Sequence, residues 1–267
     1  MNKNPIRFVG EKLLNTSLSI GKATSVLYQI VFWILRGEVK IKESVKQLYE
    51  VGVASLPVIV LTSFFTGMVL AFQTGSASTH WIGEPIYIGS VVGFSMVKEL
   101  GPVLTAVVLA GRVGAAITAE LGTMKVTEQI DALYTLGTNP ISYLAIPKFL
   151  GCVIGVPILT IFSDIVGILG GLFVSVYYLN ISSTAYWSQI VDFMYIDDFF
   201  QGLIKAVFFG FIIAVISIYK GFMCKGGAKG VGKASTSSVV VSMVLILVSN
   251  YFLTSTLVTL GIGVSRH

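Results

Sequence analysis

The run VGVASLPVIVLTSFFTGMVLAF, from Val51 to Phe72, contains no charged side chain. An α-helix needs about 20 consecutive apolar residues to cross the hydrocarbon core of a bilayer, and this run is long enough. Its one proline, Pro57, does not prevent a crossing, because membrane helices tolerate proline where neighbouring groups satisfy the freed carbonyl. The run therefore predicts a transmembrane helix.

Four further apolar runs follow, at 86–118, 147–179, 199–219 and 239–263. The chain of 267 residues is 54% hydrophobic and 12% charged, with a mean hydropathy of +0.86. A soluble domain carries about 25% charged residues. We therefore expect an all-α integral membrane protein with five transmembrane helices, in a membrane domain that covers 51–263. Residues 1–50 mix polar and apolar side chains, which predicts an N-terminal helix at the membrane interface.

Lysine and arginine are distributed unequally over the segments between the runs. They are frequent before Val51 and in 220–233, whereas 73–85 and 180–198 contain none. Positive residues accumulate on the cytosolic side of membrane proteins. We therefore expect the N-terminus and the segment 119–146 in the cytosol, and the C-terminus, after five crossings, on the opposite side.

The net charge of +5 does not indicate nucleic-acid binding, because the basic residues gather at the ends of apolar runs instead of alternating with aromatic residues on one polar face. The two histidines, His80 and His267, have no evident nucleophile partner. The acidic group at Asp192, Asp197 and Asp198 is expected to be solvated beside the membrane. We therefore expect no nucleic acid, metal or cofactor on this chain.

Two adjacent charges, Lys98 and Glu99, interrupt the second apolar run. An ionisable group at membrane depth costs at least ~2.5 kcal/mol unless it is paired or faces water. Adjacent helical residues point about 100° apart, so these two are not expected to satisfy each other. One interpretation is a structural pair with another buried group, such as Arg112 or Asp164. The other is a polar patch in a cavity or pathway, where Pro102 frees a backbone carbonyl and lets the helix bend.

The segment TEQIDALY, residues 127–134, predicts a short amphipathic helix on the cytosolic side. Thr127 is a candidate N-cap, and Ile130 and Leu133 lie on one apolar face. Gly137 and Pro140 should end the helix. The pattern alone leaves two interpretations open, a helix resting on the bilayer surface and a docking helix for a soluble partner.

The segment GAKGVGKA, residues 227–234, approaches the Walker A pattern for phosphate binding. Ala234 stands where that pattern requires a Ser or Thr hydroxyl for magnesium, and the segment connects two apolar runs in place of a strand and a helix. We therefore do not expect nucleotide binding here. A flexible basic loop near anionic lipid headgroups is the expected structure.

Several longer motifs together resemble the MlaE (YrbE) family of permeases. The resemblance covers roughly residues 45–262. Its motifs are KELGPVLT at 98–105, AGRVGA at 110–115, AELGTMKVTEQIDAL at 119–133, Asn139-Pro140, Pro147, GVGKAST at 230–236 and Val239-Val240.

The resemblance implies a homodimeric permease subunit of an ABC transporter, which moves phospholipid or a related lipid between two membranes. ATP and magnesium would bind to a separate cytosolic ATPase, and an MCE-domain lipid-binding protein would be a further partner. The residues implied for ATPase docking are Glu120, Glu128, Ile130, Asp131 and Leu133. The residues implied near a lipid cavity or pathway are Lys98, Glu99, Pro102 and Arg112.

Family members occupy the inner membrane of bacteria with two membranes, or alternatively the plastid inner envelope. Lys98 stands where some relatives carry arginine, which keeps the charge but removes the bidentate donor geometry for phosphate. Two other functions remain as alternatives from the residues alone. One is an integral membrane lipid-modifying enzyme that uses Glu99 or the external aspartates, and the other is a passive channel.

Overall fold

The computed structural model describes residues 5–82 and 87–261, and every regular element within those residues is helical. Three short stretches are π-helical and interrupt longer helices. The elements are α1 (Pro5–Leu35), α2 (Ile41–Gly52), α3 (Leu56–Ile82), α4 (Ile88–Ser95), η1 (Met96–Leu100), α5 (Gly101–Leu109), η2 (Ala110–Gly114), α6 (Ala115–Val126), α7 (Gln129–Thr135), η3 (Ile141–Ala145), α8 (Ile146–Tyr177), α9 (Ser183–Phe193), α10 (Ile196–Phe222) and α11 (Gly227–Thr259).

Six helical segments of the described chain are long and apolar enough to cross a membrane. Five of them cover most of the predicted runs, and they are Ile41–Ser78, Ile88–Val126, Ile141–Tyr177, Ile196–Phe222 and Gly227–Thr259. The sixth, Ser17–Leu35 in α1, differs from the expected five, because the polar residues before it concealed its apolar C-terminal half. Its mean hydropathy of 1.4 is the lowest of the six. The chain is thus an all-α membrane protein, with one more candidate span than the sequence predicted.

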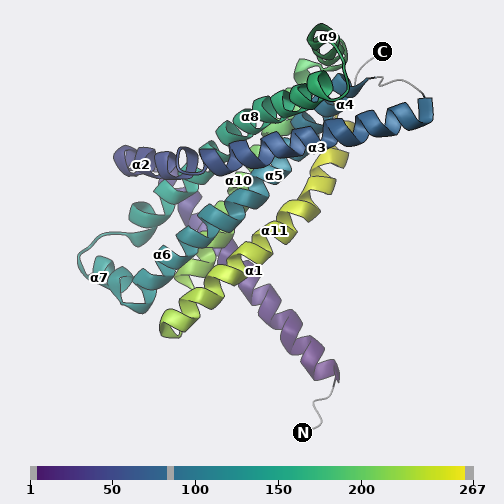
Figure 1. The fold of residues 1–267 in the computed structure, drawn as a ribbon. Coiled ribbons are helices and arrows are strands. Elements are labelled where there is room, and N and C mark those ends of the chain that lie inside the picture. Colours follow the sequence, from purple (N-terminus) through teal and green to yellow (C-terminus); the bar gives the residue numbers. More distant parts are fainter. Residues whose placement is uncertain (1–4, 83–86, 262–267) are drawn as a thin grey trace.

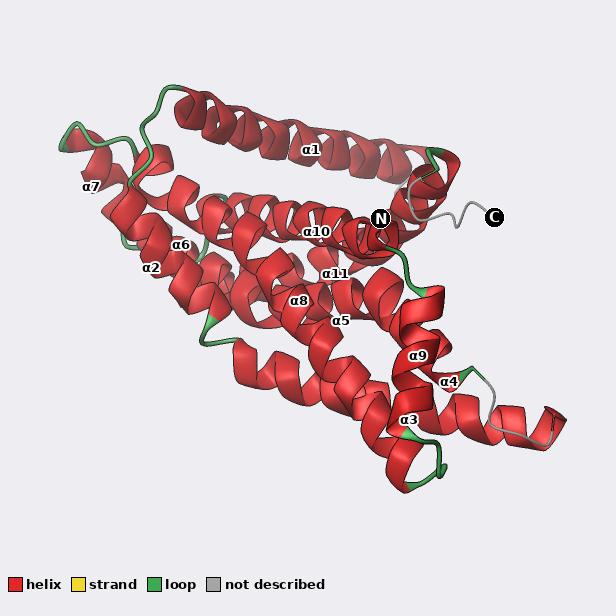
Figure 2. Cartoon of the chain, turned by 90° about the horizontal axis from the view of Figure 1, so that it is seen from above, coloured by secondary structure: helices red, strands yellow, loops and turns green. Residues whose placement is uncertain are grey.

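The long helices form a bundle with distinct ends. Helix α7 and the connection between α10 and α11 lie at one end, and α9 lies at the other (Figure 1). Helix α1 packs beside α10 at one edge of the bundle, and α3 lies at the opposite edge (Figure 2). Helix α1 also runs across the direction of α5, α6 and α11 (Figure 1). The segment 119–146, which was predicted to be cytosolic, and the lysine-rich segment 220–233 therefore lie at the same end.

Helix α8 occupies the centre, where it packs against α2, α3, α5 and α10. Its contact with α3 depends on glycines, because a methyl group on Gly67 of α3 would meet the backbone of Gly167 and one on Gly170 would meet the backbone of Phe64. The two helices also share a buried hydrogen bond of 2.7 Å between Ser63 and Ser163. Small residues that bring helix backbones together are typical of membrane interfaces. The α3–α8 contact is therefore a close helix pair of this kind.

We expect Gly170→Leu to destabilise the protein by about 2–3 kcal/mol, because the added side chain has no room against α3 and forces the two backbones apart. The measurement is the thermal midpoint of the detergent-solubilised chain, together with its recovery as a monodisperse peak. Gly232→Leu is the matched control, since nothing lies within 4 Å of a Cβ at that position. Equal midpoints for the two variants would contradict the close packing of α3 on α8.

Three predicted loops are shorter or more ordered than expected. Helix α11 begins at Gly227, so the predicted basic loop is mostly helical. Helix α3 continues to Ile82 through much of the predicted polar segment 73–85. The segment 180–198 contains α9, capped by the Ser182 hydroxyl, which accepts a hydrogen bond from the Ala185 amide at 3.2 Å. Polar residues alone do not end a helix when capping and packing extend it.

Candidate functional site

A group of charged and polar side chains lies inside the apolar bundle, where η1, α10 and α11 meet. We call it the central ion-pair cluster, and its members are Lys98, Glu99, Asp198, Lys205, Asn250 and Thr254. Lys205 Nζ lies 2.6 Å from Glu99 Oε1, and Lys98 Nζ lies 2.9 Å from Asp198 Oδ1. Two ion pairs therefore join η1 to α10.

Helix α11 completes the coordination of the Glu99 carboxylate. Asn250 Nδ2 donates to Glu99 Oε2 at 2.9 Å, and the Thr254 hydroxyl donates to Glu99 Oε1 at 3.1 Å. The Lys205 side chain is completely buried, whereas that of Glu99 is 37% exposed. The cluster thus has a closed interior that holds Lys98, Asp198 and Lys205, and an open side at the Glu99 carboxylate.

Pro102 explains how the backbone takes part in this cluster. It has no N–H group, so the carbonyl of Lys98, four residues earlier, lacks its α-helical donor. Lys205 Nζ donates to that carbonyl at 3.0 Å. Gly202 allows the approach, because a side chain there would meet the carbonyl oxygen of Val97. The prediction that Pro102 frees a carbonyl is confirmed, and a π-helical turn marks the same place, as is frequent at functional sites.

As predicted, Lys98 and Glu99 do not pair with each other, and each pairs with a buried group on another helix. The partners are Asp198 for Lys98 and Lys205 for Glu99, so the suggested partners Arg112 and Asp164 were wrong. Asp198 is 3% exposed, so the expectation that it is solvated was wrong too. It lies in the first turn of α10 and accepts a hydrogen bond from the backbone N–H of Tyr195 at 3.0 Å.

One sequence signal could have found these partners. Lys205 is the single charge inside the fourth apolar run, and Asp198 precedes it by seven residues, which places both on the same face of α10. Asn250 and Thr254 carry no comparable signal, because uncharged polar residues are common in membrane helices. Asp164, the partner considered from sequence, is buried on α8 against Gly101.

Arg112 lies in η2, away from the central ion-pair cluster. Its guanidinium donates to the Ser55 hydroxyl at 2.5 Å, and it lines a groove between α2 and α6 that also contains Glu120. The Glu120 carboxylate forms an ion pair of 2.5 Å with Lys148, whose side chain is 3% exposed. The four residues predicted to share a cavity thus lie in two places: Lys98, Glu99 and Pro102 at η1 and α5, and Arg112 at the α2–α6 groove.

Helix α7 forms where the amphipathic helix was predicted, but it starts two residues later. Thr127 does not cap α7. Its hydroxyl donates to the Thr123 carbonyl, which belongs to the preceding helix α6. The turn is made by Glu128, which has a left-handed backbone with φ of 62°. Gly137, with φ of 71°, ends the helix as predicted, with its N–H bonded to Tyr134 and that of Thr138 to Leu133.

The predicted docking residues of this region fall into two groups. Ile130 is 3% exposed and packs with Leu133 against the core, so these two side chains anchor α7. Glu128 and Asp131 are exposed, and Asp131 accepts two hydrogen bonds from Lys125 at 2.9 and 3.1 Å. Tyr134 and Leu136, at 60% and 77% exposure, add apolar surface beside these two charges.

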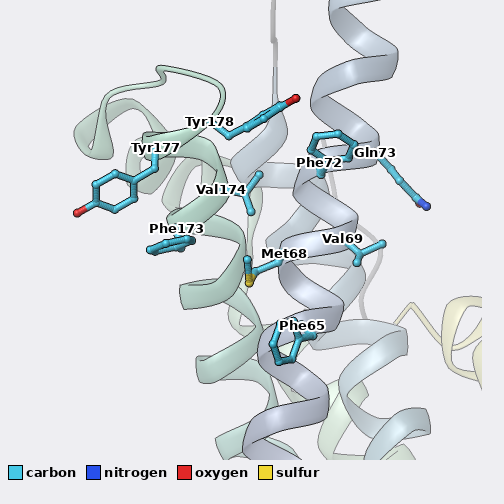
Figure 3. Close-up of a pocket in the computed structure, with 9 residues that line it drawn as sticks. All are labelled: Phe65, Met68, Val69, Phe72, Gln73, Phe173, Val174, Tyr177 and Tyr178. Carbon is cyan, nitrogen blue, oxygen red and sulfur yellow. The ribbon is translucent and has the colours of Figure 1, made fainter.

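An apolar groove runs between α3 and α8, close to the α9 end of the bundle. Its volume is about 550 Å³, within the range of small-ligand sites. Figure 3 shows Phe72 and Tyr178 together at one end, with ring centroids 5.0 Å apart, and Phe65 at the other end. Met68 and Val174 lie between them (Figure 3). The lining is almost entirely aromatic and aliphatic, which suits a hydrocarbon chain better than a polar ligand.

Comparison with known proteins decides the family. Residues 44–256 match the family model of the permease MlaE. The chain belongs to the MlaE permease family. A probable ABC transporter permease protein of Rickettsia typhi is 43% identical to this MlaE permease over 95% of the chain and 98% of the relative.

Other relatives of this MlaE permease support the same assignment. A probable ABC transporter permease protein of a Synechocystis species is 43% identical over 84% of the chain and 85% of the relative. One from Pyropia yezoensis is 41% identical over 78% of the chain and 79% of the relative. The family resemblance stated from the motifs is confirmed, and the relatives occur in bacteria and in plastids.

Membership assigns the general role of this MlaE permease. It is a multi-pass, non-catalytic membrane subunit of an ABC transporter, which works with a separate ATPase subunit. The alternatives of a lipid-modifying enzyme and a passive channel are therefore set aside. The Walker A-like segment 227–234 lies in the first turns of α11 instead of in a loop between a strand and a helix, so it lacks the geometry of a phosphate-binding loop.

Proposed function

We propose that this chain is the permease of a homodimeric lipid transporter, which moves phospholipid or a related lipid between the bacterial inner membrane and a second membrane. The observation that carries the proposal is the Glu99 carboxylate, a charge on a transmembrane helix that is 37% exposed while its partner Lys205 is completely buried. An ionisable group that is held open at membrane depth marks a substrate pathway more often than a structural contact.

The groove between α3 and α8 supports an apolar cargo. A lipid presents hydrocarbon chains and a polar headgroup together. The protein offers an aromatic and aliphatic groove for the first and a charged cluster for the second. The groove uses α3, from the first predicted run, and the cluster uses η1, from the second. This combination supports a lipid over a fully polar solute.

The surface of α11 supports a homodimer. Only 11% of its spanning segment is buried within one chain, and its exposed face carries Val240, Val244, Leu247 and Tyr251. The same helix holds Glu99 through Asn250. A second copy packed against α11 would place the two Glu99 carboxylates around a shared central cavity.

Helix α1 runs across the direction of the spanning helices α5, α6 and α11 (Figure 1), which supports a position at the membrane interface. Its segment Ser17–Leu35 is only 11% buried within the chain, as expected for a helix in contact with lipid. Five crossings would then follow, with the N-terminus and α7 in the cytosol and the C-terminus on the opposite side. Helix α7 would dock on the ATPase, and an MCE-domain protein would bind on the α9 side.

The mechanism that fits this arrangement is a change of state driven by differential binding. ATP would close the two ATPase subunits, α7 would move with them, and the long helix that includes α6, η2, α5 and η1 would transmit the movement to the central ion-pair cluster. The π-helical turns η1 and η2 are the places where that helix departs from regular α geometry. The central cavity would then pass lipid to or from the MCE-domain protein.

Affinity purification of the full-length chain in mild detergent tests the proposal, with mass spectrometry of both proteins and lipids. We expect a complex with two copies of the chain, an ATPase, an MCE-domain protein and phospholipid, and ATP-dependent lipid transfer after reconstitution. Recovery of an intact complex that carries no lipid and transfers none would refute the lipid assignment. A stable monomeric chain in an active complex would refute the homodimer.

A further inference from the structure

A polar groove lies between α2 and the helix formed by η2 and α6, on the α7 half of the bundle. Its volume is about 340 Å³. Gln47 and Glu50 line it from α2, and Arg112 and Glu120 line it from the other side, with Val113 and Ile117 as the apolar floor. It is separate from the central ion-pair cluster and from the apolar groove between α3 and α8.

Only one of the three charges in this groove has an ionic partner within the described chain. Glu120 pairs with the buried Lys148. Arg112 donates to the neutral hydroxyl of Ser55, and no carboxylate of the described residues forms an ion pair with it. Glu50 accepts a hydrogen bond from the neutral amide of Gln47 at 3.2 Å, and likewise has no cation as partner among these residues. Both residues are exposed, so the groove presents to a ligand one cation and one anion that have no ionic partner among the described residues.

The positions of these charges match the region where a lipid headgroup meets its hydrocarbon chains. Arg112, Ala116 and Glu120 are spaced by four residues and line the same groove, so they span about 12 Å along the helix. Glu120 lies near the end of α6 at Val126, and Arg112 lies deeper in the spanning segment 88–126. An arginine at such depth requires an anion, water or another polar partner to offset its charge.

We propose that this groove binds the headgroup of a zwitterionic phospholipid, with the phosphate on Arg112 and the ammonium group on Glu50. The inference rests on the proposed lipid transport and specifies which lipid the chain takes up from the α7 side. The guanidinium presents several donors in one plane, which suits two phosphate oxygens. A lipid with a phosphate but no ammonium group would leave Glu50 without a counter-ion in a partly apolar groove.

The test uses the full-length chain assembled with its ATPase in nanodiscs. The probes are phosphatidylethanolamine, phosphatidylcholine and phosphatidylglycerol with identical acyl chains, and native mass spectrometry measures the lipid retained after detergent exchange. We expect the unmodified chain to retain the two zwitterionic lipids in preference to phosphatidylglycerol. Glu50→Gln should reduce that preference on the order of tenfold, the effect of losing one charge-assisted hydrogen bond.

Variants of Arg112 separate the phosphate contact from the ammonium contact. Arg112→Gln should lower the retention of all three lipids, and Arg112→Lys, which keeps the charge without the planar fork, should lower it less. Glu43→Gln is the matched control for Glu50→Gln, because it removes the same charge from α2 outside the groove lining. It should leave the headgroup preference unchanged.

Equal retention of phosphatidylglycerol and phosphatidylethanolamine, or an unchanged preference in Glu50→Gln, would overturn the inference. Competition with soluble probes identifies the source of the ligand chemistry. If inorganic phosphate displaces the lipid as well as glycerophosphoethanolamine does, the groove is a phosphate site and the zwitterionic assignment is wrong. Lipid transfer is measured in parallel: ATP-driven transfer without headgroup preference refutes only this inference, whereas no ATP-driven transfer of any lipid refutes the proposed function.

Discussion

Lys205→Met is expected to abolish ATP-dependent lipid transfer and to destabilise the membrane domain. The Lys205 ammonium group forms an ion pair with the Glu99 carboxylate, and it also donates to the Lys98 carbonyl that Pro102 frees. Removal of one partner of a buried ion pair costs about 3–5 kcal/mol, but because Glu99 is 37% exposed and water recovers part of that cost, we expect about 2 kcal/mol. Thermal unfolding in detergent and lipid transfer by the reconstituted complex measure the two effects.

The double variant Glu99→Gln with Lys205→Met separates structure from transport. Replacing both charges removes the unpaired carboxylate, and the glutamine side chain still has Asn250 and Thr254 within reach, so stability should return to within about 1 kcal/mol of the unmodified chain. Transfer should stay lost, because the open carboxylate is absent. If the double variant regains both stability and transfer, the central ion-pair cluster is structural and the proposed cavity role is wrong.

The combined substitutions Glu128→Lys and Asp131→Lys are expected to remove most of the coupling between permease and ATPase. Both side chains are exposed on or beside α7, and Asp131 is held by Lys125. If the ATPase surface that contacts α7 is basic, reversing these two charges replaces attraction between the subunits by repulsion. Like charges placed opposite each other in an interface cost several kcal/mol of binding free energy. Co-purification of the ATPase and its lipid-stimulated hydrolysis are the measurements.

Two control variants remove the structural explanations for that loss. Lys125→Gln breaks the exposed ion pair with Asp131 without changing the charge of α7, and it should affect stability by less than about 1 kcal/mol. Glu128→Gly removes the side chain at a left-handed position that glycine adopts without strain, so folding should be kept. A charge-reversed variant that still co-purifies with an ATPase and hydrolyses ATP at the normal rate would contradict docking through α7.

The family and the five apolar runs from Val51 onward were readable from the sequence, because motifs and apolar runs are local features of the chain. A bilayer requires a fixed length of apolar helix, so the five runs stand out in any window of suitable size. The position of α1 is different. Ser17–Leu35 contains Lys22 and several hydroxyl residues, and only its average hydropathy, together with its packing on α10, distinguishes it from a purely polar surface helix.

The candidate site was readable in part. The cost of burying Lys98 and Glu99 located the central ion-pair cluster, and the missing N–H of Pro102 correctly indicated a freed carbonyl. The end of α7 at Gly137 followed from the conformational freedom of glycine. Its start did not, because Thr127 had two competing hydrogen-bond partners, and the structure uses the carbonyl behind it in α6.

By itself the sequence determined that the chain enters a membrane, roughly where it crosses, and that charges at 98–99 must be compensated, because hydrocarbon excludes unpaired charge and long apolar runs exclude water. Only the tertiary structure decided that Lys205, Asp198 and Asn250 provide that compensation, and that Arg112 belongs to a different groove. The physical reason is that these partners are brought together by packing between helices far apart in the chain, such as Glu99 with Asn250, a separation of 151 residues. Helix periodicity specifies the face on which a charge lies, but the neighbouring helix specifies what that charge meets.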